Sequence, residues 1–438
     1  DYIANTMGAL LTRELSGAIT DFGPTRFDKR HHFVRLGSGS IGGKARGIAF
    51  LNSLLPRLRE TMSHEGVEIR IPDTFVLGTD LFDAFIAEND LHDRALACET
   101  DREVNRLFRK ARMPDVLRQA IRQFLEDVHD PIAVRSSSLL EDSKALPFAG
   151  LYKTFMLPNS HPERKVRERQ LKEAIKLVYA SVYYQSPKQY ARSSNFRIEE
   201  EKMGVIIQQV VGKRYGDRFY PVVSGVAQSY NFYPFTGMKP EDGVAYVVLG
   251  LGKGVVEGGH VYRFSPKNPA AVPPYGSVGE FMRNTQSRFY ALDMSDPAIK
   301  IRDSEDFSLV QPELETALAD GSLFFVGSTY CPDDGRFRDS VALDGPKVVT
   351  FAHLTKYRMF PLGEILTEAL AIGRDAFGSP VEIEFAINLE RKETWEGTFH
   401  FLQIRPMVAG REQLDVISEE DPAGPVISIR LPVLATRF

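Results

Sequence analysis

The sequence predicts an α+β protein of two lobes, with a helix-rich first half and a strand-rich second half. Apolar residues recur every three or four positions in segments before residue 195, whereas β-branched and aromatic runs dominate from residue 204 onward. The chain has 438 residues, about three times a typical domain of roughly 150 residues. This length favours two or three packed units, and the change of pattern predicts a boundary near residues 195–204.

Helices are expected in the first half wherever the apolar repeat has helical spacing. Residues 102–128 show this repeat with an interruption at Pro114, which predicts two amphipathic helices whose apolar faces contact the core. Residues 45–55 and 171–192 predict one helix each. Apolar runs at 33–36 and 131–134 predict strands, the first followed by a glycine-rich loop and the second by Arg135.

The second half is predicted to consist mainly of strands. The strands are expected at residues 205–211, 220–227, 244–251, 323–326, 348–351, 381–387 and 398–404. One helix over residues 362–376 precedes the last two strands. We therefore divide the chain into a helix and connector (1–35), a first lobe (36–203), a second lobe (204–410) and a linker-like tail (411–438), in which proline and glycine surround Ala423.

Composition excludes several classes of protein. The net charge of −4 and the pI near 6.2 give no global attraction to nucleic acid or to an anionic membrane, so neither partner is expected. No apolar stretch approaches the roughly 20 residues of a membrane span. The two cysteines, Cys98 and Cys331, have no metal-ligand spacing, which argues against disulfide scaffolds and zinc sites and fits the reducing cytoplasm.

A glycine-rich loop after the strand at 33–36 is the first candidate for binding chemistry. It reads Gly37-Ser38-Gly39-Ser40-Ile41-Gly42-Gly43-Lys44. Glycines let main-chain N–H groups approach phosphate oxygens, a helix N-terminus adds a favourable dipole, and a lysine adds charge. A Walker A loop is excluded, because Ser38 replaces its first glycine and Ala45 its magnesium-binding hydroxyl. A turn that binds no ligand stays open.

Two other nucleotide-binding motifs fail on their context. The spacing of Gly37, Gly39 and Gly42 matches a dinucleotide fingerprint, but no parallel βαβ alternation follows it. The triplet Asp21-Phe22-Gly23 imitates a kinase DFG motif, but it precedes the glycine loop and the sequence holds no HRD motif. Neither motif assigns a function.

The last two predicted strands bring polar side chains together. The period of two places Glu382 and Glu384 on one face of the first strand, and Gln403 and Arg405 on one face of the second. If the strands pair through a polar link at residues 388–397, these four side chains share one surface. One interpretation is an amphipathic hairpin with a solvated face. The other is a site for Mg²⁺ and phosphate, since Mg²⁺ prefers oxygen ligands and arginine binds phosphate bidentately.

Arg135 ends a buried strand and precedes three serines, with Glu141 and Asp142 close behind. A guanidinium beside hydroxyl groups can cradle a phosphate. A serine-rich loop without a ligand is the alternative. Residues 148–150 and 250–254 add two further glycine elements.

Taken in order, these segments resemble one known family. The segments are Gly42-Gly43-Lys44-Ala45-Arg46-Gly47, Val134-Arg135-Ser136-Ser137, Phe148-Ala149-Gly150, Ile207-Gln208-Gln209-Val210-Val211, Ser224-Gly225-Val226-Ala227, Gly250-Leu251-Gly252, Glu382-Ile383-Glu384 and Leu402-Gln403-Ile404-Arg405-Pro406. The set is similar to the ATP-binding domain shared by phosphoenolpyruvate synthase, pyruvate phosphate dikinase and rifampin phosphotransferase. This resemblance covers residues 42–406 and implies an ATP-grasp-type fold.

The resemblance implies roles for the matching residues. Lys44 and Arg135 would hold and polarise the phosphates, and Arg405 would stabilise phosphoryl charge. Glu384 and Gln403 would coordinate Mg²⁺, and Glu382 would lie near the reacting phosphate. The implied nucleotide-binding residues are Gly42, Gly43, Lys44, Arg135, Ser137, Gly150, Gln208, Gln209, Val210, Val211, Glu384, Gln403 and Arg405, of which residues 208–211 would line the adenine pocket.

The resemblance also implies partner domains. In these enzymes a swivelling domain carries a catalytic histidine in a Gly-x-x-[Ser/Thr]-His setting, and a third domain binds the acceptor. None of the nine histidines has this setting, and the first residue is Asp1 rather than methionine. We therefore expect an ATP-binding part of a longer protein, which binds ATP and Mg²⁺ and passes a phosphoryl group to a histidine supplied elsewhere.

Two other functions stay open. A catalytically silent nucleotide-sensing or regulatory domain is suggested by Lys253, which stands where the family commonly has glutamate, and by the leucines at 139 and 140, which replace small residues. A carboxylate–amine ligase with the same fold type is disfavoured, because the segments around Arg135 and Arg405 are those of the dikinase group.

Overall fold

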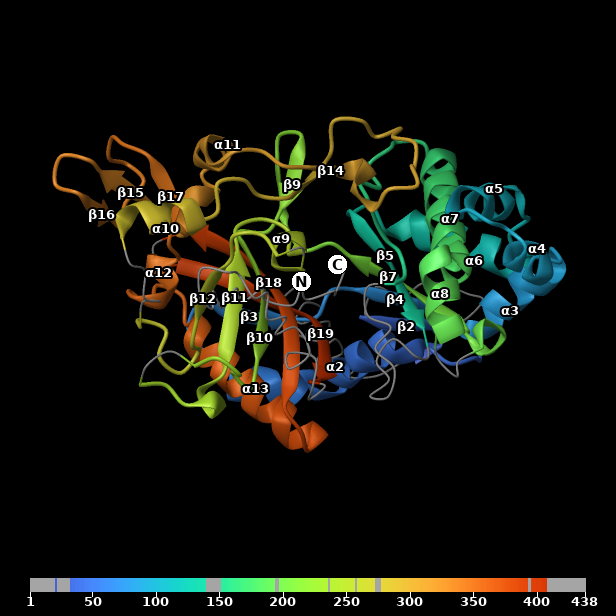
Figure 1. Cartoon of the computed structure of the whole chain (residues 1–438), viewed down its shortest axis with the longest axis horizontal. Helices are drawn as coiled ribbons and strands as arrows, with labels where there is room; N and C mark the ends of the chain where they lie inside the picture. The colour runs from blue at the N-terminus through green and yellow to red at the C-terminus, as the bar shows by residue number, and fades with distance from the viewer. Residues whose placement is uncertain are drawn as a thin grey trace, which may run out of the picture.

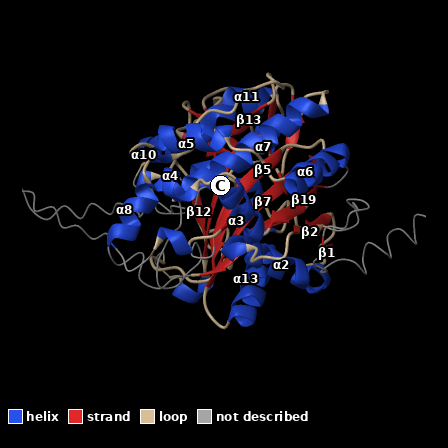
Figure 2. Ribbon diagram, turned by 90° about the vertical axis from the view of Figure 1, so that its right-hand side faces the viewer, coloured by secondary structure: helices blue, strands red, loops and turns tan. Residues whose placement is uncertain are grey.

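A computed structural model describes residues 20–21, 32–138, 151–193, 197–234, 237–256, 258–271, 277–392 and 395–407. Within these residues the chain forms a mixed α/β fold of four sheets and their covering helices (Figure 1; Figure 2). The predicted α+β class is confirmed at this level. The helix expected within residues 1–35 and the tail at 411–438 lie outside the described residues.

The first sheet has the strand order β1-β2-β4-β7-β5-β6. The strands are β1 (Thr20–Asp21), β2 (Phe33–Leu36), β4 (Thr74–Leu77), β7 (Met203–Gln209), β5 (Ile132–Ser138) and β6 (Thr154–Leu157). β1, β2 and β4 are parallel, and β7, β5 and β6 pair antiparallel with their neighbours. β5 is buried along its whole length, so any polar side chain on it must find its partners inside the protein.

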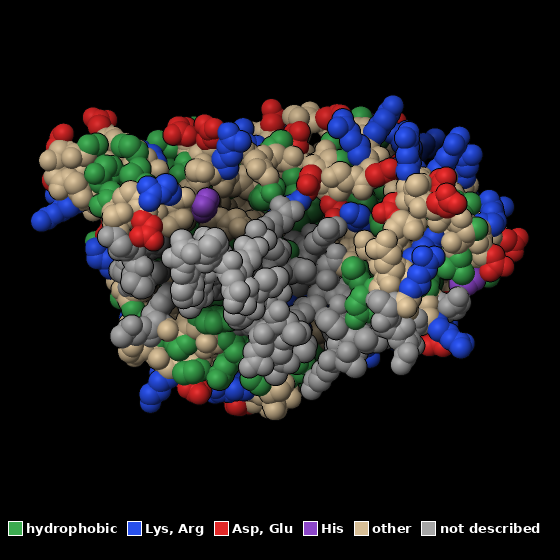
Figure 3. Space-filling view, viewed as in Figure 1, with side chains coloured by type: hydrophobic (Ala, Val, Ile, Leu, Met, Phe, Trp, Pro, Cys, Tyr) green, Lys and Arg blue, Asp and Glu red, His purple; other side chains and the backbone are tan. Residues whose placement is uncertain are grey.

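Helices cover the outer face of this sheet, on the right in Figure 1. They are α3 (Thr79–Glu88), α4 (His92–Leu96), α5 (Asp101–Lys110), α6 (Asp115–Asp127), α7 (Arg164–Ala180) and α8 (Gln185–Ser193). The predicted pair of helices over 102–128 is confirmed as α5 and α6, and Thr100 and Glu103 form a capping box at the start of α5. Lys and Arg side chains gather at the upper right of the face in Figure 3, with some acidic side chains among them.

The prediction of one continuous helix over residues 171–192 is wrong. α7 ends at Ala180, a 3₁₀ turn η1 (Ser181–Tyr183) follows, and α8 begins at Gln185. Pro187 explains the break, because a proline has no N–H to donate inside a helix and is tolerated only in the first turn. The apolar repeat of residues 171–192 continues through the 3₁₀ turn, so the repeat alone does not show that the helix is interrupted there.

Helix α2 (Gly42–Thr61) runs beneath the space between the two large sheets (Figure 1). It is longer than the predicted segment 45–55 at both ends. A Cβ atom on Gly47 would lie 2.3 Å from the carbonyl oxygen of Ile404, so only glycine allows the helix to approach this strand so closely.

The second sheet has the order β12-β11-β10-β18-β19-β3. The strands are β12 (Tyr262–Phe264), β11 (Val244–Val248), β10 (Val223–Gln228), β18 (Val381–Arg391), β19 (Trp395–Pro406) and β3 (Val67–Arg70). All pairs are antiparallel except β19 with β3. Helix α13 (Leu362–Phe377), which matches the predicted helix, packs on this sheet and ends at Gly378 in the left-handed conformation.

Two small sheets extend the second half. Their strands are β14 (Leu309–Val310), β13 (Ala291–Asp293), β9 (Arg218–Tyr220) and β8 (Lys213–Tyr215) in one, and β16 (Arg336–Arg338), β15 (Gly327–Cys331) and β17 (Lys347–Val349) in the other. The remaining helices and 3₁₀ turns are α9 (Lys253–Val256), α10 (Val278–Asn284), α11 (Leu314–Ala319), α12 (Ala352–Thr355), η2 (Ile198–Glu200), η3 (Pro240–Asp242), η4 (Glu305–Ser308) and η5 (Ser322–Phe325).

The strand predicted at 323–326 is wrong, because this segment forms the 3₁₀ turn η5. Gly321 precedes it with a positive φ of 78°, and Leu323 and Phe325 are buried in the turn. A short apolar run is compatible with a buried strand or a buried turn, so its composition alone does not distinguish them.

A segment at residues 297–308 joins the two halves, and we call it the connecting segment. The amide of Gln170 donates to the carbonyl oxygens of Pro297 and Ile299, and Glu305 accepts a 2.6 Å hydrogen bond from the main-chain N–H of Thr154. The connecting segment therefore fastens the second half to α7 and β6.

Sheet membership does not change at residue 204. β7 (Met203–Gln209) lies in the middle of the first sheet, and β3 (Val67–Arg70) forms an edge of the second. The chain therefore leaves the first sheet after Gln209, and an early segment contributes to the second sheet.

Within the described residues, no helix is both long and apolar enough to cross a membrane.

Candidate functional site

The first part of the glycine loop is held by a carboxylate of the protein. Asp80 accepts hydrogen bonds from the main-chain N–H groups of Ser38, at 3.0 Å, and Gly39, at 2.9 Å, and Gly37 has a positive φ of 92°. These N–H groups are therefore engaged within the protein, as the turn interpretation expects. The N–H group of Gly42 also has a partner within the loop, the Ser40 hydroxyl, at 3.3 Å.

The second part of the loop is fastened to the end of β5. The Ser137 hydroxyl donates to the carbonyl oxygen of Ile41 at 2.8 Å and accepts from the N–H of Ala45 at 3.0 Å. The Lys44 ammonium lies 3.4 Å from the hydroxyl of Ser136 and is only 6% exposed. These contacts place the start of α2, where Gly42 and Gly43 are also buried, beside the residue that follows Arg135.

Arg135 connects the two large sheets. Its Nη2 atom donates to Gln403 Oε1 at 2.8 Å and to Glu384 Oε2 at 3.2 Å, and its Nη1 atom donates to Gln208 Oε1 at 3.1 Å. Arg135 and Glu384 are each 3% exposed and Gln403 is 1% exposed. One buried guanidinium thus joins β5 and β7 of the first sheet to β18 and β19 of the second.

The predicted pairing of the last two strands is confirmed. Glu382 lies opposite Arg405 and Glu384 opposite Gln403 in the β18–β19 ladder, which has an irregularity after Glu384. Both carboxylates are at least 95% buried, so the interpretation as a solvated hairpin face is wrong. The polar link predicted at 388–397 is also wrong, because the ladder continues to Arg391 and Trp395.

Glu382 holds Arg405 in place. Its Oε1 atom accepts hydrogen bonds from Nε of Arg405, at 2.8 Å, and from Nη2 of the same side chain, and its Oε2 atom accepts from Gln228 at 2.9 Å. Because both carboxylate oxygens are engaged, Glu382 is suited to orienting the guanidinium. Gln228 was not predicted, since no pattern in the sequence shows that β10 pairs with β18.

A pocket that is open to solvent lies beside Arg135. All four residues of the predicted adenine segment, Gln208 to Val211, line it. The walls otherwise consist mainly of apolar side chains, among them Ala133, Met156, Pro221, Ala386 and Leu402. An apolar pocket with a few fixed polar groups at one end is the usual form of a site for a flat organic ring joined to a charged group.

Comparison with known proteins identifies the family. A family model described as "Pyruvate phosphate dikinase, AMP/ATP-binding domain" matches residues 38–423. The chain belongs to this family. The match covers the whole second sheet, the first sheet except β1 and β2, and the residues around Arg135, Glu384 and Gln403.

Curated relatives of this dikinase-family chain are named phosphoenolpyruvate synthase or phosphotransferase. The chain is 30% identical to phosphoenolpyruvate synthase of Deinococcus radiodurans over 44% of this chain and 24% of that protein. It is 28% identical to phosphoenolpyruvate synthase of Aeropyrum pernix over 50% of this chain and 25% of the relative. An uncharacterized phosphotransferase of Bacillus subtilis, YvkC, is 27% identical over 43% of this chain and 20% of its own length. The matches thus span about a quarter of the relatives' length.

The donor set at the centre of this dikinase-family site fits Mg²⁺. A carboxylate oxygen of Glu384 and the amide oxygen of Gln403 converge on one cationic nitrogen, Nη2 of Arg135. Mg²⁺ uses one or two protein oxygens and completes its shell with water and phosphate. Among the described residues no group of three or more His, Cys, Asp or Glu side chains is arranged to hold a metal ion, so the site differs from an all-protein metal cage.

Gly150, predicted to bind the nucleotide, lies outside the described residues, as do residues 139–142, 148 and 149.

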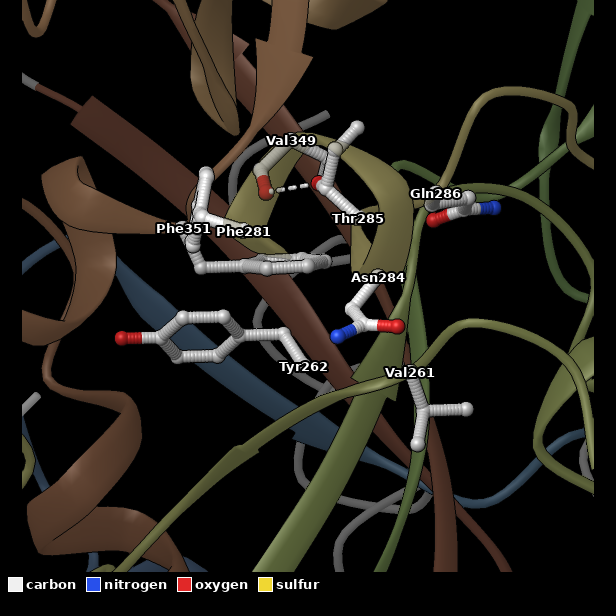
Figure 4. A pocket seen from close by; sticks show the side chains of 8 residues that line it. All are labelled: Val261, Tyr262, Phe281, Asn284, Thr285, Gln286, Val349 and Phe351. Carbon is white, nitrogen blue, oxygen red and sulfur yellow. Dashed lines mark hydrogen bonds between the residues drawn. The ribbon is translucent and has the colours of Figure 1, made fainter. Parts of the chain in front are cut away.

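A second pocket, shown in Figure 4, is lined by the rings of Tyr262, Phe281 and Phe351 and by five other residues, none of them acidic or basic. It contains none of the predicted site residues.

Proposed function

We propose that this chain binds Mg·ATP between its two large sheets and passes a phosphoryl group to a histidine on a separate swivelling domain. One observation carries the proposal: Arg135 is hydrogen-bonded on one side to Gln208, in the segment lining the apolar pocket, and on the other to Glu384 and Gln403. A base in the pocket would therefore leave its phosphates beside the guanidinium and the proposed metal ligands.

In this proposal the other charged residues of the site contribute to phosphoryl transfer. Phosphoryl transfer depends mainly on positioning and on neutralising charge, so the domain needs no covalent nucleophile. Lys44, near the start of α2, would contact the phosphates, and Arg405, oriented by Glu382, would stabilise the transferred group. Glu384 and Gln403 would hold Mg²⁺, which would supply positive charge to neutralise the phosphates.

We further propose that the two large sheets are the lobes of an ATP-grasp-type fold. In this proposal the first lobe ends after Gln209 and the second holds residues up to about 407, with β3 crossing between them. The histidine-bearing domain and an acceptor-binding domain would belong to the same longer protein or to a partner chain, in the cytoplasm.

Calorimetric titration of Mg·ATP tests the nucleotide site. Arg405→Ala and Glu384→Gln each remove a charge-assisted contact, which costs on the order of 2 kcal/mol, or about thirtyfold in affinity. Glu390→Gln is the matched control, because Glu390 lies on the same strand β18 but pairs with Lys213 away from the site. Unchanged affinity in both site variants would dismiss the proposal.

Transfer itself is tested with ATP labelled at the β- or the γ-phosphate. The chain is incubated with the histidine-bearing domain of a related phosphoenolpyruvate synthase, and acid-labile, base-stable label on that domain is measured. Label on the domain supports the transferase, and the position of the label shows which phosphate moves. Tight ATP binding without any transfer would instead support the nucleotide-sensing alternative.

A further inference from the structure

We infer that the guanidinium of Arg135 and a divalent cation compete for the same two oxygens, Glu384 Oε2 and Gln403 Oε1, so that metal binding requires Arg135 to move to the phosphates. This inference rests on the proposed function, since it takes Glu384 and Gln403 as the metal ligands. It adds that Arg135 makes metal and nucleotide binding depend on each other.

The geometry allows only one cation between these oxygens. A single atom, Nη2 of Arg135, lies 3.2 Å from Glu384 Oε2 and 2.8 Å from Gln403 Oε1. All three residues are at least 97% buried, so water screens little of the charge of Arg135 and Glu384. A divalent cation bound to the same oxygens would lie against the guanidinium and repel it strongly at this distance.

Arg135 has the means to exchange its partners. Its Nη1 atom donates to Gln208, whose own amide donates to Thr74 Oγ1 at 3.2 Å, so this end of the contact is anchored in the first sheet. Its Nε atom is buried and has no hydrogen-bond partner among the described residues. The guanidinium can therefore keep Gln208, release the second sheet and offer Nη2 and Nε to phosphate oxygens in the adjoining pocket.

Charge explains why the exchange needs both ligands. Removing Arg135 from Glu384 without a replacement leaves a buried carboxylate unpaired, which is strongly unfavourable. A metal ion without a nucleotide would pair with the Glu384 carboxylate but leave the Arg135 guanidinium without a negative partner. A nucleotide without a metal ion would pair with the guanidinium but leave the carboxylate unpaired. Metal and phosphate together satisfy both groups, so we expect strong synergy between them.

Mn²⁺ binding, followed by electron paramagnetic resonance, tests this inference, because Mn²⁺ takes the same oxygen ligands. In the wild-type chain ATP should tighten Mn²⁺ binding by about tenfold or more. Arg135→Ala should bind Mn²⁺ alone at least about tenfold more tightly than wild type, and Mn·ATP more weakly. The gain should vanish in Arg135→Ala with Glu384→Gln. Arg109→Ala removes an arginine from two carboxylates elsewhere and should change none of these values.

Two further measurements guard against a misfolded variant. Arg135→Gln keeps the side chain polar and should show the same gain in metal affinity. Free guanidinium ion added to Arg135→Ala should refill the gap and weaken Mn²⁺ binding, with no such effect on wild type.

The outcomes separate this inference from the function on which it rests. If wild type binds Mg·ATP through Glu384 but metal and nucleotide bind independently, or if folded Arg135 variants bind Mn²⁺ no more tightly than wild type, the competition is refuted and the nucleotide site stands. If Glu384→Gln and Arg405→Ala both leave Mg·ATP binding unchanged, the proposed function itself fails.

Discussion

The main chain at Gly42 passes so close to Ser137 that a Cβ atom on Gly42 would lie 1.8 Å from the Ser137 carbonyl oxygen. Gly42 also has a positive φ of 78°, a backbone conformation that residues other than glycine rarely adopt. The start of α2 thus depends on the absence of a side chain at this position.

Gly42→Ala should therefore displace the start of α2 and weaken nucleotide binding. The left-handed conformation alone costs about 1 kcal/mol, and the contact with main-chain atoms of β5 adds to it. We expect a lower thermal midpoint and a loss of Mg·ATP affinity in calorimetry. Gly279→Ala is the control, because its new Cβ would meet its nearest neighbour at 3.6 Å. Equal stability of the two variants would contradict this account.

Gln228→Leu should destabilise the second sheet. The change leaves Oε2 of the buried Glu382 without its hydrogen bond from Gln228, and an unsatisfied buried acceptor costs about 1–3 kcal/mol. Urea denaturation measures the loss. Lys392→Met removes an exposed ion pair with Glu396 at the turn between β18 and β19. It should leave the urea midpoint unchanged, because solvent screens that pair. A Gln228→Leu variant as stable as wild type would show that Glu382 finds another donor.

Reversing the charge of Lys253 should loosen the connecting segment. Lys253 forms an ion pair with Asp306, so Lys253→Glu creates a like-charge contact. Asp306→Lys added to Lys253→Glu should restore the attraction. Asp306 is more than half exposed, so we expect a coupling of only about 0.5–1 kcal/mol between the two sites. The four free energies of unfolding measure this coupling, and strictly additive effects would argue against the ion pair.

The stability of the second sheet should fall with acid because of His400. Burial disfavours the imidazolium and, with Arg70 nearby, lowers the pKa of His400 from 6.5 to about 4. The unfolded chain then binds more protons than the folded chain between these values. The free energy of unfolding should therefore decrease as the pH falls from about 6.5 to 4, by at most about 3 kcal/mol, and this contribution should be constant above pH 6.5.

Urea denaturation at pH 7.5, 6 and 4.5 checks this dependence. His400→Gln should flatten the decrease relative to wild type, whereas His129→Gln, at an exposed position, should follow the wild-type curve. Parallel curves for His400→Gln and wild type would show that other groups cause the acid sensitivity.

The hairpin of the candidate site could be predicted from the sequence because its information is local. Alternation fixes which side chains of β18 and β19 share a face, and the short separation of the strands makes them neighbours. What alternation could not show is burial. The face that carries Glu382 and Glu384 is polar, yet β5 and β10 bring Arg135 and Gln228 against it from elsewhere in the chain.

The glycine loop shows what its residue types alone could not predict. Its residue types are those of an anion-binding loop, and Gly39 does present its N–H group to an anion. That anion is the side chain of Asp80, 41 residues later in the chain. Composition identifies the kind of partner such a loop accepts, but only the tertiary structure shows that a carboxylate from α3 takes this place.

The exchange of β3 and β7 between the sheets bears on any attempt to study the protein in pieces. A gene fragment that starts at residue 204 would lack β3 and leave β19 with an open edge, and the complementary fragment would lack β7 from the middle of its sheet. Open edges pair with other chains and aggregate. Half-length fragments made singly should therefore be insoluble, and reconstitution of nucleotide binding should require both fragments to be synthesised in the same cell.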